Sequence, residues 1–210
     1  ARDAIDDDDL PKVDDFGDHL LVIIHGLRGH DIETYEIDCF LTAKRQLITI
    51  RHGFSPSIDA LWNVAPTHPD LLGSTPGELL ARLADVTTRR FLGVLDAFDD
   101  RIDDLIAAAL DADPRLIGEV TAVRADLRIV RRVIHPQREV FDMLRTTSSP
   151  LLGEPGRRRF ADAFDVAARV SGGVDAARGA LVETLDAYRG AEAREALSLI
   201  HISEPTRPLD

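Results

Sequence analysis

The residues best suited to chemistry in the first quarter of the chain are four histidines. His19, His25, His30 and His52 stand within or beside apolar, strand-like segments. Imidazole is a common metal ligand, but the spacing of these four is not that of a zinc site. We predict that they are strand-edge or surface histidines. The alternative is a transition-metal site.

Catalytic motifs are missing from the sequence. It contains no P-loop, no G-x-G-x-x-G, no H-E-x-x-H and no G-x-S-x-G. Cys39 is the only cysteine, so there is no disulfide framework, and we expect its thiol to serve packing. The sequence therefore predicts a protein that is not an enzyme.

Charged side chains recur at helical spacing in two consecutive segments. One segment is acidic and the next is basic. The acidic set is Asp96, Asp99, Asp100, Asp103 and Asp104, and the basic set is Arg124, Arg128, Arg131 and Arg132. The sets form either a salt-bridged or solvated face, in which exposed pairs contribute about 0 to 1 kcal/mol each, or an acidic surface that concentrates cations.

Composition narrows the class of partner. The chain has 210 residues, 44% of them hydrophobic, and a formal net charge of -12. This size and composition are typical of a globular protein, and the charge argues against nucleic acid as a partner. The longest apolar run, "LLVII", is too short to span a bilayer. Because Ala1 is the first residue and Met143 the only methionine, we expect a fragment of a longer protein.

The elements that must position these side chains change type along the chain. Apolar runs at 19–25, 33–41 and 47–52 predict three strands of a partial sheet. Proline-led segments at about 76–112, 114–145 and 155–196 then predict three long helices, the first two forming an antiparallel hairpin. The fold class is thus α+β. Pro136 lies inside the second long helix, and we expect it to bend that helix rather than end it.

Seven motifs occur in the order found in one family of membrane proteins. They are "PKV", "EIDCFL", "LITI", "DALW", "TPGELLARLADV", "IHPQREVF" and "ETLDAY". In this respect residues 3–197 resemble the cytosolic domain of CorA-type divalent-cation transporters. The resemblance implies a homopentamer that conducts Mg²⁺, and in some members Co²⁺, Ni²⁺ or Zn²⁺. It also implies a plasma-membrane protein whose membrane spans lie outside this cytoplasmic portion.

The resemblance also implies metal-binding residues. Family members hold regulatory Mg²⁺ between neighbouring cytosolic domains, which keeps the pore closed. Alignment of the motifs places Asp3 and Asp162 at the partner carboxylate positions of that site, and Asp85 near a second, weaker site. The chain departs from the family pattern at Arg2, where an acidic residue is frequent, and at Val166, where some relatives have histidine.

The same resemblance implies a domain organisation. Residues 1–74 are the C-terminal part of the α/β domain, 75–148 the helical hairpin and 149–197 the stalk helix. Residues 198–210 match neither a stalk nor a membrane span and are predicted to be a non-native tail. The predicted function is a metal-sensing and gating domain of a divalent-cation transporter. The alternative is a helical scaffold protein with charged arms and no specific metal.

Overall fold

The computed structural model describes residues 9–28 and 32–203, with the side chains of 198–203 excluded. The chain divides into two compact units. We call Ala1–Leu95 with Arg128–Val174 the sheet unit, and Asp96–Leu127 with Asp175–Asp210 the hairpin unit. Asp3 and His30 lie outside the described residues.

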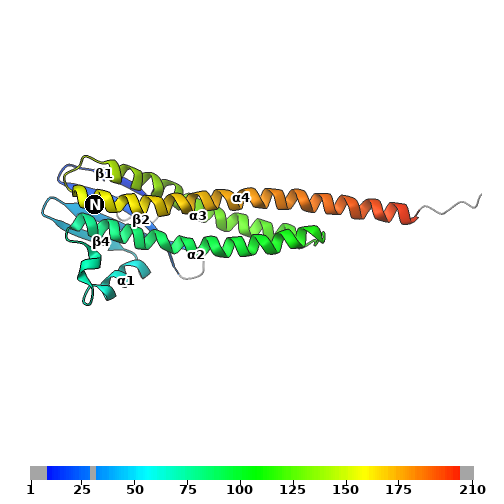
Figure 1. The fold of residues 1–210 in the computed structure, drawn as a ribbon, viewed down its shortest axis with the longest axis horizontal. Coiled ribbons are helices and arrows are strands. Elements are labelled where there is room, and N and C mark those ends of the chain that lie inside the picture. Colours follow the sequence, from blue (N-terminus) through cyan, green and yellow to red (C-terminus); the bar gives the residue numbers. More distant parts are fainter. Residues whose placement is uncertain (1–8, 29–31, 204–210) are drawn as a thin grey trace, which may run out of the picture. The chain divides into compact units, whose positions relative to one another are not determined.

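The sheet unit begins with four antiparallel strands joined in sequence order (Figure 1). They are β1 (Lys12–Asp15), β2 (His19–Arg28), β3 (Glu33–Thr42) and β4 (Gln46–Arg51). The three predicted strands are confirmed, and β1 is an additional one. It is short and half acidic, so it lacks the apolar run that marks its neighbour β2. Pairing to β2, with Val13 opposite Val22, gives it its strand conformation.

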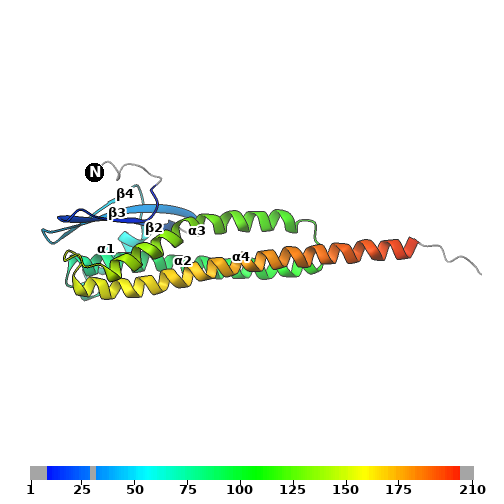
Figure 2. The ribbon, with the colours of Figure 1, turned by 90° about the horizontal axis from the view of Figure 1, so that it is seen from above.

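The core of the sheet lies in its two central strands. Nearly all of β2 is buried, and Ile37, Cys39 and Leu41 on β3 are each at most 1% exposed. Burial on both faces explains why β2 reads as an unbroken apolar run. In Figure 2 the sheet forms one layer of this unit and its helices form another.

Two short helices follow the sheet, α1 (Pro56–Val64) and the 3₁₀ helix η2 (Pro69–Leu72). Ser55 caps α1, because its hydroxyl accepts a hydrogen bond from the Ile58 backbone N–H. The long helix α2 (Pro76–Leu110) starts with a capping box, in which Thr75 Oγ1 accepts from the Glu78 N–H and Glu78 accepts from the Ser74 N–H.

The second long helix, α3 (Leu116–Thr146), is continuous through Pro136, as predicted. In the sheet unit it packs on α4 (Gly153–Ser203) through aromatic rings. Phe141 and Phe160 have ring centroids 5.7 Å apart, and the Arg145 guanidinium lies 4.3 Å from the ring centroid of Phe164. These contacts join α3 and α4 on both sides of the short connection between them.

Two adjacent glycines in α4 play different roles. A Cβ at Gly173 would lie 2.7 Å from Leu95 Cδ1, so this glycine allows close packing against α2. A Cβ at Gly172 would meet nothing within 4 Å. Of these two glycines, Gly173 is therefore the one that packing requires.

The hairpin unit contains the end of α2, the start of α3 and the later part of α4. Phe98, Ile102 and Leu105 of α2 are buried, as are Leu116 and Val120 of α3. Arg101 Nη1 donates to Asp126 Oδ2 at 2.6 Å and ties the two helices. The five aspartates of the acidic set are exposed, as both alternatives for this face require. Within the described residues, no helix is long and apolar enough to cross a membrane.

Candidate functional site

Two of the three predicted metal-site residues line one pocket in the sheet unit. The pocket has a volume of about 370 Å³ and lies between α2 and α4. We call it the α2–α4 pocket. Its lining consists of Ala81, Arg82, Asp85 and Arg89 from α2 and Arg159, Asp162, Asp165 and Val166 from α4.

Helical periodicity explains this lining. Residues three or four apart on a helix share a face, so Arg82, Asp85 and Arg89 form one row along α2. Asp162 and Asp165 form a similar row on α4. Arg159, one turn before Asp162, donates its Nε hydrogen to Glu78 Oε1 at 3.1 Å and joins the start of α4 to the capping box of α2.

Asp85 is buried and fully engaged by arginines. Asp85 as a whole is 7% exposed to solvent. Arg82 Nη1 donates to Oδ2 at 2.9 Å, and Arg89 Nε donates to Oδ1 at 2.7 Å. Two charge-assisted hydrogen bonds thus satisfy this carboxylate within a single helix.

The carboxylates of the pocket raise the pKa of Arg89. The hydrogen bond from Arg89 to Asp85 raises the pKa of the guanidinium, and the negative charges of Asp85 and Asp162 add to that rise. Arg89 therefore interacts with carboxylates from both helices. Its side chain is nevertheless 53% exposed.

Asp162 and Asp165 are the accessible acids of the pocket. Both are exposed, and within the described part of the chain neither forms a hydrogen bond or ion pair. Asp165 is not among the predicted site residues, although its spacing from Asp162 places the two on one face. Their oxygens are free to accept hydrogen bonds from water or from a hydrated ion.

The donor chemistry and size of the pocket fit a hydrated divalent cation. Carboxylate oxygens are the ligands that Mg²⁺ prefers, and Mg²⁺ usually keeps several waters beside one or two carboxylates. Six waters at about 30 Å³ each fit within the volume of the pocket. Asp162 and Asp165 would hold such an ion, whereas Asp85 is engaged by arginine. Residues 9–28 and 32–203 contain no group of three or more histidine, cysteine, aspartate or glutamate side chains placed to hold a metal.

The spacing of these arginines around Asp85 is a signal that the prediction did not use. In "ARLADVTTRR", Arg82 precedes Asp85 by three residues and Arg89 follows it by four. Those are the spacings at which helical side chains pair. The pairing of Asp85 with Arg82 and Arg89 was thus predictable from the sequence.

The histidines do not converge on a metal site in the described residues. His19 stacks on Phe16 with ring centroids 4.8 Å apart and hydrogen-bonds Asp18, and His52 is exposed. His25 differs from the prediction, because it is only 8% exposed. Burial lowers the pKa of its imidazole and keeps the ring neutral.

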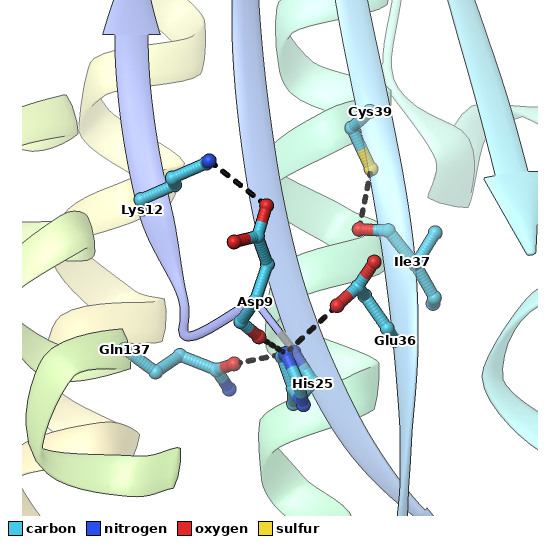
Figure 3. A network of polar contacts seen from close by, with 7 residues as sticks. All are labelled: Asp9, Lys12, His25, Glu36, Ile37, Cys39 and Gln137. Carbon is cyan, nitrogen blue, oxygen red and sulfur yellow. Dashed lines mark hydrogen bonds and ion pairs between the residues drawn. The ribbon is translucent and has the colours of Figure 1, made fainter. Parts of the chain in front are cut away.

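His25 belongs to a buried polar network rather than to a reactive site (Figure 3). Its Nε2 lies 2.7 Å from the Asp9 carbonyl oxygen, which requires a hydrogen on that nitrogen, and 3.6 Å from Glu36 Oε2. On the same strand as Glu36, Asp38 is 2% exposed, and burial raises the pKa of its carboxyl. The side chain of Gln137 enters this network from α3.

The chain belongs to the family described as CorA-like Mg²⁺ transporter protein, whose sequence pattern it matches over residues 1–195. This finding confirms the predicted family. The zinc transport protein ZntB of Yersinia enterocolitica is 27% identical over 158 residues, which cover 72% of this chain and 47% of that protein. The chain spans about half the length of the curated relatives that it matches.

Two solved structures share the fold. The soluble domain of CorA from Methanocaldococcus jannaschii has a TM-score of 0.73 and 20% identity, covering 89% of this chain and 76% of that one. The ZntB cytoplasmic domain from Vibrio parahaemolyticus has a TM-score of 0.77 and 16% identity, covering 91% and 77%. They confirm the α+β fold, with an antiparallel sheet followed by long helices.

Proposed function

We propose that this chain is the cytosolic sensing domain of a divalent-cation transporter. The α2–α4 pocket, with Asp85 and Asp162, is its regulatory cation site. By the family resemblance Asp3 is a further metal ligand, although it lies outside the described residues. The ion is Mg²⁺, with Co²⁺, Ni²⁺ or Zn²⁺ as alternatives. The complete transporter is a homopentamer of the plasma membrane.

One observation carries the proposal. Asp85 and Asp162 are far apart in sequence, and they line the same pocket together with Asp165. Two helices thereby present carboxylates to one volume that is large enough for a hydrated ion. Membership of a transporter family supports a cation as the ligand.

The pocket can act as a sensor through linked equilibria. An ion that binds one arrangement of subunits and not another stabilises the first by RT ln(1 + [L]/Kd), which is about 2.7 kcal/mol at a concentration one hundred times Kd. Asp162 and Asp165 hold the ion and its waters on α4. Loss of the ion removes this stabilisation and releases the arrangement that it favoured.

Thermal unfolding and sedimentation of residues 1–210 test the proposal. Both are measured with and without millimolar Mg²⁺ at matched ionic strength, so that general screening cancels. We expect Mg²⁺ to raise the melting temperature or the sedimenting mass. The double variant Asp162→Asn, Asp165→Asn should lose this response.

A matched control removes the same charge elsewhere. Asp99→Asn with Asp103→Asn changes two exposed aspartates of α2 that lie outside the pocket. We expect this control to keep the full Mg²⁺ response. An equal response in the wild type and in the pocket variant would contradict the assignment of the site.

A further inference from the structure

The α2–α4 pocket is lined by positively charged side chains as well as by carboxylates. Three arginines and three aspartates line it, so its formal charges cancel. Arg159 is also engaged by Glu78, which leaves Arg82 and Arg89 as the direct partners of Asp85. A divalent ion entering this pocket meets positive charge beside its ligands.

At Asp85, arginine side chains and a divalent ion would compete for the same two carboxylate oxygens. Both carboxylate oxygens already accept a guanidinium hydrogen bond, at 2.9 and 2.7 Å. An ion can coordinate Asp85 only where one of these bonds opens. An opened bond must be replaced, because the Asp85 carboxylate is only 10% exposed and a buried unpaired charge is costly.

Arg89 is the arginine better placed to leave. Its side chain is 53% exposed, against 35% for that of Arg82, so its guanidinium can turn into water. It also interacts electrostatically with Asp162 across the pocket. Departure of Arg89 would therefore free Asp85 Oδ1 on α2 and move a positive charge away from Asp162 on α4.

We propose that Arg89 is a tethered competitor of the divalent cation, holding Asp85 until the ion displaces it. This inference rests on the proposed sensing function and adds how the affinity of the site is set. The guanidinium keeps the buried carboxylate satisfied in the ion-free state. It also weakens cation binding, so that the pocket responds only to high cation concentrations.

Calorimetric titration of residues 1–210 with Mg²⁺ tests the competitor. Arg89→Gln removes the charge, and we expect it to bind Mg²⁺ about tenfold more tightly than the wild type. Arg89→Lys keeps a positive charge and should change the affinity less. Arg189→Gln is the matched control, because Arg189 forms an exposed ion pair with Asp186 outside the pocket, and its affinity should equal that of the wild type.

A second readout is independent of affinity. Without Mg²⁺, Arg89→Gln should melt at a lower temperature than the wild type, since Asp85 loses a partner, and Mg²⁺ should restore more stability to it than to the wild type. Arg82→Gln tests the other oxygen of Asp85 and replaces Arg89→Gln if that variant does not fold. It too should tighten binding.

The outcomes separate the two proposals. Unchanged or weaker Mg²⁺ binding in Arg89→Gln and Arg82→Gln would overturn the competitor, and loss of binding in Asp162→Asn would then still support the site. Absence of Mg²⁺ binding in the wild type and all the arginine variants would overturn both. Binding seen only after removal of Arg89 would support the competitor directly.

Discussion

Gln137 accepts the backbone hydrogen bond of His25 beyond the point where the pairing of β2 with β1 stops. β1 pairs with β2 only as far as Lys12 opposite Ile23, so the His25 N–H lies beyond it. Gln137 Oε1 accepts that hydrogen at 2.7 Å, while its Nε2 donates to Thr88 Oγ1 at 3.0 Å. One side chain of α3 thus joins the sheet to α2, and Figure 3 shows its contact with His25.

The first prediction concerns this connection. Gln137→Met keeps the shape of the side chain and removes both hydrogen bonds. Because a buried N–H without a partner costs about 1–3 kcal/mol, we expect the free energy of unfolding to fall by about that amount. Urea denaturation measures it. Gln46→Met, at an exposed position, is the control and should change stability little.

A pair of glycine substitutions in α2 should have opposite effects. A Cβ at Gly77 would lie 2.3 Å from the Leu152 backbone oxygen, so Gly77→Ala should destabilise the protein by about 1–3 kcal/mol. A Cβ at Gly93 would meet nothing within 4 Å, so Gly93→Ala should stabilise it by about 0.5–1 kcal/mol through helix propensity. Melting temperatures that move in the same direction would refute this packing.

His25 should make the protein sensitive to acid. Its folded pKa is lowered from 6.5 by burial, with a smaller contribution from Arg132, opposed by the Asp9 carbonyl and carboxylate. The unfolded state therefore binds the proton more readily, and stability should fall as the pH drops below about 6.5, down to the folded pKa. Glu36 Oε2 lies 3.6 Å from the His25 Nε2, within ion-pair distance of a protonated ring, but burial is the largest influence on this pKa and lowers it.

Variants isolate this contribution to acid sensitivity. His25→Gln retains a donor for the Asp9 carbonyl and does not titrate. The loss of stability between pH 7 and pH 5.5, measured by urea denaturation, should be smaller in His25→Gln than in the wild type. His68→Gln, at an exposed position, should behave as the wild type does. Equal pH dependence in all three proteins would count against a buried neutral His25.

Cys39 should be inert until the sheet unfolds. Its side chain is 0% exposed, and burial raises the pKa of the thiol, with a further contribution from the charge of Asp38. The thiolate that reacts with labelling reagents is therefore scarce and inaccessible. We expect negligible labelling by a maleimide in buffer at pH 7 to 8 and complete labelling in urea. Rapid labelling of the folded protein would contradict this burial.

Much of the fold was predictable because its elements carry strong local patterns. The apolar run of β2 and the proline-led starts of the long helices correspond to elements of the structure. β1 was missed because Lys12–Asp15 has little β pattern of its own and gains its conformation from pairing with β2. The role of Gln137 was not readable, since it depends on where β1 ends.

The candidate site was predictable only in part. Family resemblance placed Asp162 at a sensing site with Asp3 and Asp85 near a second, weaker site, whereas the structure brings Asp85 and Asp162 to the same α2–α4 pocket. The arginine pairs of Asp85 follow from helical spacing alone, whereas the approach of Asp165 and Arg159 to α2 is a tertiary effect. Local pattern predicts which residues share one helix face, and packing decides which two faces meet.

Crystallography with Co²⁺ tests the central claim most directly, because this ion scatters X-rays anomalously and shares the oxygen chemistry of the site. We predict an anomalous peak in the α2–α4 pocket beside the carboxylates of Asp162 and Asp165, with Arg89 turned away from Asp85. A pocket without a peak at saturating Co²⁺, with Arg89 still bound to Asp85, would contradict a cation site there.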